Sequence, residues 1–157
     1  MRTPDSSFVF RLVKEEDFNE LYDLLNNLPE NVRTFFHPHA FDLQTITEIC
    51  TSKKDHYFVM EQNNKIIGYS FLRLFGYETP SYGCCVRNGY QGIGYGTVLT
   101  QETMKKAKEL GYHKVILKVY KENVAAFKTY ENIGFKIVGE TDDKRQYKME
   151  INLSSKD

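Results

Sequence analysis

The order of apolar and polar positions along this chain predicts strands and helices that alternate. Between residues 18 and 28, apolar side chains recur mostly three or four positions apart, which is the spacing of one helix face. Between residues 114 and 120, every second residue is aliphatic, which is typical of a strand. Further strands are predicted at 7–13, 56–61, 66–75, 80–86, 135–139 and 145–152, and further helices at 42–52, 97–110 and 123–133.

Cap and turn residues mark the ends of these elements. Asp42 and Asn123 each stand before a helical pattern, where a side-chain oxygen can accept a hydrogen bond from a first-turn amide. The segment 62–65 is rich in asparagine and joins two strands as a hairpin. A strand, a glycine loop, a helix and a strand in succession imply a right-handed βαβ unit, and the flanking hairpins make the sheet mixed. We therefore expect an α/β protein with one domain over residues 1–157.

The loop after the strand at 80–86 carries glycines at the alternate positions 92, 94 and 96. Glycines leave backbone N–H groups uncovered where a helix begins and its dipole is positive, which suits a phosphate group. Two common nucleotide motifs fail on spacing. The dinucleotide fingerprint needs G-x-G-x-x-G, and the P-loop needs a lysine directly after its last glycine. The loop therefore indicates an anion site of another kind.

Composition narrows the classes of partner. The 21 basic and 21 acidic residues cancel, so the whole chain offers no electrostatic case for nucleic acid or a membrane surface. No apolar run approaches the roughly 20 residues of a membrane span, and the N-terminus lacks an apolar signal segment. Three cysteines, Cys50, Cys84 and Cys85, form a poor disulfide framework. Together these features favour a cytoplasmic protein with reduced thiols.

Two motifs point to a known family. Gln91-x-x-Gly94-x-Gly96 is the Gln/Arg-x-x-Gly-x-Gly/Ala signature of the GNAT superfamily of acyl-CoA-dependent N-acyltransferases, which this chain resembles. The segment from Asn123 to Phe135 is similar to the family's downstream "N…A…Y…GF" segment and lies at the usual distance. The resemblance spans about residues 7–152. It implies a central, mostly antiparallel sheet with a splayed parallel strand pair and about four helices.

The resemblance also implies how acetyl-CoA would be bound. Its pyrophosphate would lie on the loop 91–96, and its pantetheine arm would enter between the strands at 81–86 and 114–120. Tyr130 would act as general acid and give a proton to the departing CoA thiolate. Backbone N–H near Val86 could polarise the thioester carbonyl. The residues implied in binding are Cys85, Val86, Gln91, Gly92, Ile93, Gly94, Tyr95, Gly96, Thr97, Asn123, Ala126 and Tyr130.

The sequence departs from the family's pattern at the position that often supplies the catalytic base. Family members often carry a carboxylate on the strand before the glycine loop, but residues 81–85 contain none. An alkyl ammonium with a pKa of about 10.4 must lose a proton before it can attack. The candidates for the base are Glu78, His37 and His39, and an imidazole titrates in a suitable range. All three also fit solvated loop residues, and a His-x-His pair without a third ligand predicts no metal site.

The sequence does not identify the acceptor amine. Residues 28–41, the loop at 76–81 and the hairpin at 141–145 are expected to contact it. The implied reaction is direct transfer of an acetyl group from acetyl-CoA to a primary amine in a ternary complex, without a covalent enzyme intermediate. Two alternatives stay open. One is a non-catalytic acyl-CoA-binding or regulatory domain, and the other is an acetyltransferase that acts on a protein N-terminus or lysine. The chain could act alone or as a homodimer.

Plainer roles for the same residues also stay open. The three glycines can serve a tight turn, and Gln91 can be a surface residue. Asn123 can be a helix cap and nothing more. Tyr130 lies on an apolar helix face and can be a core residue with a satisfied hydroxyl group.

Overall fold

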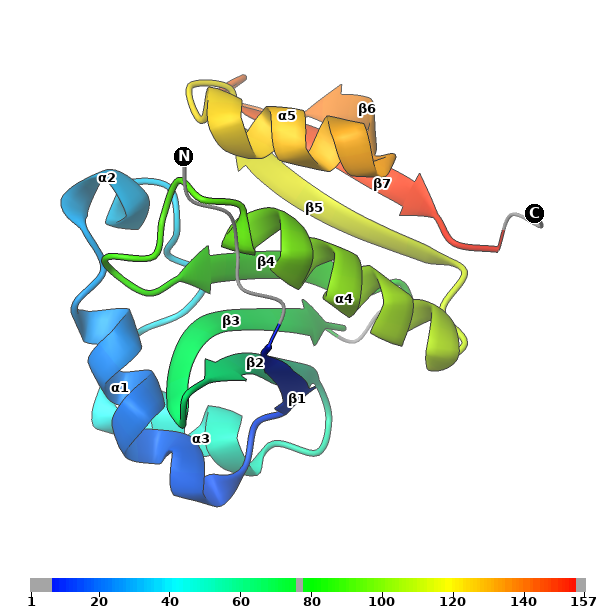
Figure 1. The fold of residues 1–157 in the computed structure, drawn as a ribbon. Helices are drawn as coiled ribbons and strands as arrows, with labels where there is room; N and C mark the ends of the chain where they lie inside the picture. Colours follow the sequence, from blue (N-terminus) through cyan, green and yellow to red (C-terminus); the bar gives the residue numbers. More distant parts are fainter. Residues whose placement is uncertain (1–6, 76–77, 155–157) are drawn as a thin grey trace.

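The computed structural model describes residues 7–75 and 78–154, and Figure 1 shows their strands and helices in succession. The strands are β1 (Val9–Leu12), β2 (His56–Gln62), β3 (Lys65–Arg73), β4 (Ser81–Val86), β5 (Lys114–Tyr120), β6 (Lys136–Glu140) and β7 (Gln146–Asn152). The helices are a 3-10 turn η1 (Glu15–Asp17) and α1 (Phe18–Asn26), α2 (Glu30–Arg33), α3 (Leu43–Thr51), α4 (Tyr95–Glu109) and α5 (Val124–Ile133). The predicted succession is confirmed, with small shifts at element ends.

One mixed sheet organises the fold, in the strand order β1-β2-β3-β4-β5-β7-β6. Among the described strands β4 and β5 form the only parallel pair, and every other neighbouring pair is antiparallel. The crossover between β4 and β5 contains α4, as the βαβ pattern predicts. This arrangement confirms the expected mixed α/β fold with a mostly antiparallel sheet.

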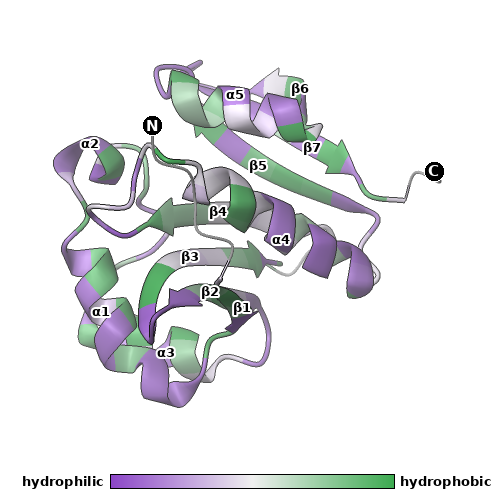
Figure 2. Ribbon diagram, viewed as in Figure 1, coloured by the Kyte–Doolittle hydropathy of each residue, from purple (hydrophilic) through white to green (hydrophobic). Residues whose placement is uncertain are grey.

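Side chains alternate between the two faces of the sheet along each strand, so each strand contributes to a different cluster of buried residues on each face. On one side of β3, Tyr69 and Phe71 pack in a cluster with leucines of α1 and isoleucines of α3. On the other side, Leu72 joins a cluster that includes Met104 of α4. Figure 2 shows apolar residues along β3, β4 and β5 and hydrophilic residues over much of α4. β3 is buried on both faces, which explains its nearly unbroken apolar run.

The parallel strands β4 and β5 separate soon after they meet. Their only registered pair is Ser81 with Ile116, next to a hydrogen bond from Ile116 N to Pro80 O (3.0 Å). Arg87 N donates to Ile67 O on β3, so alternation turns the backbone groups of Val86 and Cys84 the other way, toward β5. The splayed pair that the resemblance implies is therefore confirmed, and it leaves main-chain donors and acceptors beside the gap.

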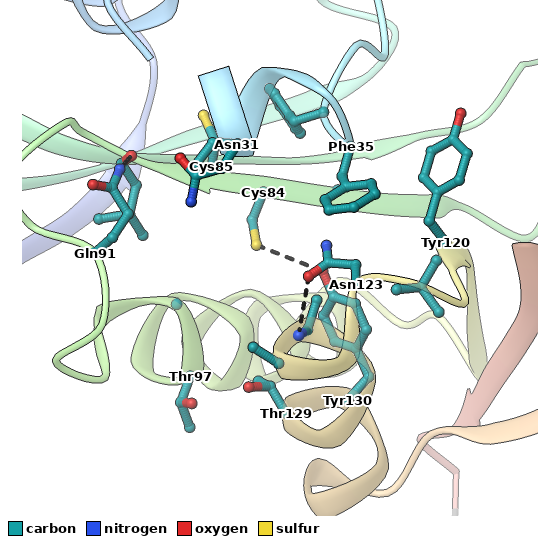
Figure 3. A pocket seen from close by; sticks show the side chains of 18 of the residues that line it. Asn31, Phe35, Cys84, Cys85, Gln91, Thr97, Tyr120, Asn123, Thr129 and Tyr130 are labelled. Atoms are coloured by element: carbon teal, nitrogen blue, oxygen red, sulfur yellow. Dashed lines mark hydrogen bonds between the residues drawn. The ribbon is translucent and has the colours of Figure 1, made fainter. Parts of the chain in front are cut away.

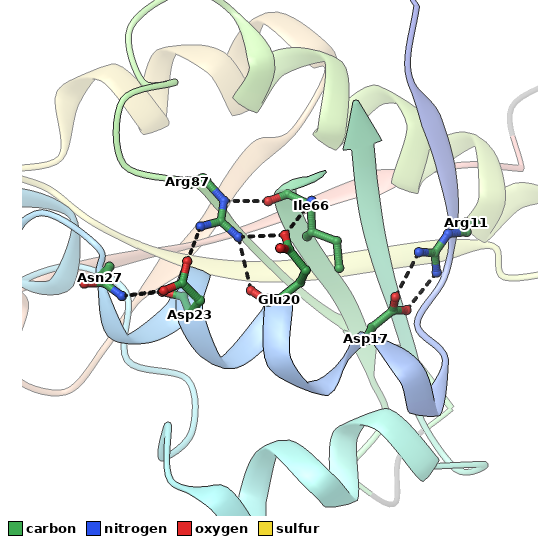
Figure 4. Close-up of polar contacts among 7 residues, drawn as sticks. All are labelled: Arg11, Asp17, Glu20, Asp23, Asn27, Ile66 and Arg87. Carbon is green, nitrogen blue, oxygen red and sulfur yellow. Dashed lines mark hydrogen bonds and ion pairs between the residues drawn. The ribbon is translucent and has the colours of Figure 1, made fainter. Parts of the chain in front are cut away.

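Arg87 fixes the point at which the chain leaves β4, as Figure 4 shows. Its Nε donates to Ile66 O (2.7 Å), and its guanidinium pairs with Asp23 (2.6 Å) and Glu20 (3.2 Å) of α1. Glu20 in turn accepts from Ile66 N (3.1 Å). Arg87 is only 6% exposed, and a buried guanidinium needs such partners. This cluster holds the start of the glycine loop against α1 and β3.

Two local features differ from the sequence-based expectation. The four-residue helix α2 overlaps the start of the segment 31–41, which carries no clear helical period, so the described α-helices include one short element more than the four expected. The helix predicted at 97–110 ends at Glu109, and Leu110, which follows it, is 46% exposed. The helix ends there because the chain turns at Gly111 (φ +95°).

Candidate active site

A cavity of about 530 Å³ opens between the separated strands β4 and β5. Its walls come from α2, the loop after β4, the first turn of α4 and α5, as Figure 3 shows for the residues that it labels. Ten predicted acetyl-CoA-binding residues line it: Cys85, Val86, Gln91, Gly92, Gly94, Gly96, Thr97, Asn123, Ala126 and Tyr130. The structure thus brings two segments about 30 residues apart into one site.

The glycine loop has backbone conformations that suit glycine. Gly92 (φ +77°) and Gly94 (φ +100°) lie in the left-handed region, and Gly94 is the N-cap of the 15-residue helix α4. A Cβ built on Gly92 or Gly96 meets no atom within 4 Å, so the space beside both residues is open. First-turn N–H groups and the positive end of the dipole therefore meet an open cavity wall, which fits the pyrophosphate of a CoA thioester.

Gln91 shapes the loop from within. Its side-chain Nε2 donates to Val86 O, and its Oε1 accepts from Gly89 N (3.2 Å). The side chain therefore closes the loop back onto the end of β4 and orders backbone that would otherwise be free. Its role as a direct ligand stays a prediction, while the two hydrogen bonds give it a structural role as well.

Two of the predicted loop residues point away from the cavity. Tyr95 is 3% exposed and Ile93 is partly buried, and both pack in a cluster with Met60 and Leu99. They hold the loop and the start of α4 against the sheet. Neither residue is among those that line the cavity, so their side chains can contribute to binding only through the loop's shape.

Tyr130 projects from α5 to the floor of the cavity. Its hydroxyl lies 3.8 Å from Cys84 Sγ, and its ring meets Tyr82 edge-on at 6.2 Å. Burial raises the pKa of Tyr130 well above the usual 10, with a further contribution from Cys84. The phenol therefore keeps its proton at neutral pH. That is the state that a general acid needs.

Asn123 has the cap role that its position predicts. Its side-chain oxygen accepts from Ala126 N (3.4 Å) at the start of α5, and the residue also lines the cavity (Figure 3). A similar cap is made by Asp42, which accepts from Thr45 N (2.8 Å). Asn123 thus combines a cap with a place in the cavity wall.

A second cavity of about 300 Å³ adjoins the first. The two share Phe35, Phe36, Tyr82, Gly83, Lys118 and Tyr120 as lining residues. Gly83 is needed there because a Cβ would lie 2.3 Å from Cζ of Phe71, whose ring crosses β4 at this point. Of the segments expected to contact the acceptor, only 28–41 and 76–81 supply lining residues. Residues 76 and 77 lie outside the described residues.

The three candidate bases are placed differently. His37 lines the second cavity, and its Nε2 lies 3.2 Å from the hydroxyl of Tyr120, which lines both cavities. His39 lines neither of these cavities. Its ring contacts Tyr69 Oη (2.9 Å) and Ala40 O (2.8 Å) beside a separate cavity of about 210 Å³. Glu78 is exposed and lines none of the cavities described here. The geometry thus favours His37 over His39 and Glu78 as the candidate catalytic base.

His39 should make the protein less stable in acid. Burial lowers its pKa below the usual 6.5, opposed by its hydrogen bond to Ala40. The unfolded chain therefore binds this proton more readily, so the free energy of unfolding should fall as the pH drops through about 6.5 toward the folded-state pKa. Urea unfolding at about pH 7.5 and pH 5.5 measures this fall. His39→Gln should reduce it, whereas an unchanged pH dependence would contradict this role. His56, whose pKa burial also lowers, should account for part of the remainder.

The comparisons with known proteins agree with this geometry. The model of the Acetyltransferase (GNAT) family matches residues 18–135, most of the chain. This chain belongs to the GNAT acetyltransferase family. It is 33% identical over 86 residues to the [ribosomal protein bS18]-alanine N-acetyltransferase of Haemophilus influenzae, a match that covers 55% of this chain and 56% of that enzyme. The chain thus matches little more than half the length of this curated relative.

Solved GNAT structures show the same fold. The ribosomal-protein-S5-alanine acetyltransferase of Vibrio fischeri superposes with a TM-score of 0.80 at 16% identity, covering 99% of this chain and 98% of that one. The spermidine N-acetyltransferase of Vibrio cholerae, in complex with CoA and spermine, gives a TM-score of 0.79 at 21% identity over 96% and 98% of the two chains. GNAT acetyltransferases use acetyl-CoA and an amine acceptor.

Sequence reasoning missed part of this GNAT site. Cys84 lines the cavity and approaches Tyr130, although its thiol was given no role. Asn31 and Phe35 reach the cavity from α2 and the segment after it, which no sequence pattern placed. Strand alternation could have found Cys84, because Tyr82 and Cys84 share a face. Within the described residues, no group of three or more His, Cys, Asp or Glu could hold a metal ion, and no helix there is long and apolar enough to cross a membrane.

Proposed function

We propose that this GNAT protein transfers the acetyl group of acetyl-CoA directly to a primary amine in a ternary complex. One observation carries the proposal. A cavity leads from the glycine loop through the gap between β4 and β5 to Tyr130, and it shares a wall that includes Tyr82, Gly83 and Tyr120 with a second cavity. Donor and acceptor could thus lie in adjoining cavities and meet at that shared wall.

The residues of the first cavity suit the donor. The open amides of the glycine loop would hold the pyrophosphate at the start of α4. Backbone groups of Cys84 and Val86 face the gap. Val86 O accepts from Gln91 Nε2, which leaves Val86 N and the backbone groups of Cys84 to match the amides of the pantetheine arm. A backbone N–H on this stretch of β4 could also stabilise negative charge that develops on the thioester oxygen.

Two residues would transfer protons, one beside the donor cavity and one beside the acceptor cavity. Tyr130 keeps its proton and would give it to the CoA thiolate as the thiolate departs. His37, bonded to Tyr120 at the edge of the acceptor cavity, is the best-placed candidate to receive the amine's proton, directly or through water. No aspartate or glutamate among the described residues lines either cavity, so no carboxylate base is assigned.

That lack of a carboxylate also favours a second candidate function, a non-catalytic acyl-CoA-binding domain. A single assay separates the two. Purified protein is incubated with acetyl-CoA and a panel of primary amines, and release of free CoA thiol is followed together with the mass of the product. Thiol release matched by N-acetylated amine supports the proposal. Acetyl-CoA binding without thiol release on any amine would instead favour the regulatory function.

A further inference from the structure

The acceptor cavity combines aromatic walls with positive charge. Six phenylalanine and tyrosine rings line it, from Phe35, Phe36, Phe71, Phe75, Tyr82 and Tyr120. Its cationic side chains are Arg73 of β3 and Lys118 of β5, and its neutral polar ones include Ser81 and Gln146. Such a surface suits an acceptor with an apolar group and a negative charge.

Arg73 is held in place but not neutralised. Its guanidinium lies 5.7 Å from the ring centre of Phe71 and 4.6 Å from that of Phe75, and it donates to Pro38 O (3.1 Å). Its Nε is buried without a hydrogen-bond partner. In the described part of the chain no carboxylate forms an ion pair with it. Asp55, which shares a separate cavity with Arg73, accepts from Leu74 N instead.

Lys118 adds a second positive charge without a partner. It is exposed on the wall shared by the two cavities, and no ion pair joins it to a described carboxylate. Lys148 lies directly opposite it on the neighbouring strand β7, and two like charges in such a pair repel each other. A carboxylate bound beside Lys118 would relieve that repulsion.

The missing acids exclude one kind of acceptor and favour another. A polyamine carries ammonium groups besides the one that reacts, and neither cavity has a described carboxylate to pair with them. An amine that also carries a carboxylate matches the charges instead. Nearby cations also disfavour the ammonium form of the reacting amine, which eases its deprotonation where no acidic side chain can act as base.

We propose that the acceptor is a small amino carboxylate with an apolar or aromatic side chain, held by Arg73 and Lys118 at its carboxylate and by the rings at its side chain. The inference rests on the proposed function, because it assumes that the second cavity is the acceptor site. The cavity of about 300 Å³ lies at the lower end of small-molecule sites, which favours a single amino acid over a longer peptide.

Matched pairs of amines test the inference. Phenylalanine, leucine and methionine are compared with their decarboxylated amines, with spermine and with a C-terminally amidated peptide, using kcat/KM for N-acetylation. At least one amino acid should exceed its decarboxylated partner by about 10- to 100-fold, as a charge-assisted contact implies. Arg73→Gln should remove most of that preference while it leaves the decarboxylated amine nearly unchanged. A purely structural Arg73 would lower both rates together.

Lys118→Gln and Lys148→Gln form a matched control on the same face of the sheet. Lys148 is opposite Lys118 but lines neither cavity, so only Lys118→Gln should reduce the preference. Binding of each pair to the CoA-saturated protein is measured alongside, so a protein without turnover still tests the inference. Equal or reversed preference within every pair, or better use of spermine or the peptide, would overturn it.

Discussion

Tyr130→Phe is expected to lower kcat by about 10²- to 10⁴-fold, the usual contribution of a general acid, and to change acetyl-CoA affinity by only a few-fold. The variant keeps the ring that packs against Tyr82 and Phe135 and removes only the hydroxyl group. That hydroxyl group makes one long contact, at 3.8 Å to Cys84 Sγ, so its loss should cost less than about 1 kcal/mol of stability. Steady-state kinetics and acetyl-CoA titration measure the two effects separately.

Tyr82→Phe is the matched control, because Tyr82 is a buried tyrosine whose ring contacts that of Tyr130. Its hydroxyl group bonds Thr100 Oγ1 (2.8 Å) within the core, so the variant should affect stability more than kcat. Since burial places the pKa of Tyr130 above 10, ionisation of this group should not reduce kcat at any pH below about 10. Equal losses of kcat and acetyl-CoA affinity in Tyr130→Phe would show that Tyr130 packs and donates no proton.

Gly92→Val should weaken acetyl-CoA binding by about 10- to 100-fold, because the added side chain would stand at the open anion-binding wall and hinder one or more charge-assisted hydrogen bonds. The backbone at Gly92 has φ +77°, so the variant should also lose at least about 1–2 kcal/mol of stability. Calorimetric titration gives the affinity, and chemical unfolding gives the stability.

Gly111→Val separates the two effects. Gly111 has a similar backbone conformation (φ +95°), and a Cβ there also meets no atom within 4 Å, but the residue lies beyond α4 and away from the cavity. The two variants should therefore lose similar stability, and only Gly92→Val should lose affinity. If Gly111→Val weakened acetyl-CoA binding as much, the loss would come from strain in the fold and not from the loop.

Local chemistry made the donor side predictable from the sequence. The spacing of Gly92, Gly94 and Gly96 requires only a strand before and a helix after, and both are present. Asp42 and Asn123 were identifiable as caps because their hydrogen bonds reach only three residues along the chain. Such features depend on a few adjacent residues and do not need the tertiary fold.

The rest of the site, on both the donor and the acceptor side, depends on contacts that no local pattern encodes. Arg87 joins α1 across more than 60 positions, and Arg73 reaches Pro38 across 35, so neither role follows from spacing. Ile93 and Tyr95 sit within a motif that suggests binding, yet their apolar bodies pack against the sheet. His39 and His37 have similar surroundings in the sequence, but the ring of His39 packs against Tyr69 and Phe71 and lines neither the donor nor the acceptor cavity.

Calorimetric titration of the wild-type protein with acetyl-CoA tests the central claim most directly. We expect one site per chain, with a Kd between about 1 μM and 1 mM, the usual range of substrate affinities. Free CoA should bind at the same site, because the loop would contact its pyrophosphate and not its acetyl group. Correctly folded protein that binds neither acetyl-CoA nor CoA would contradict the account.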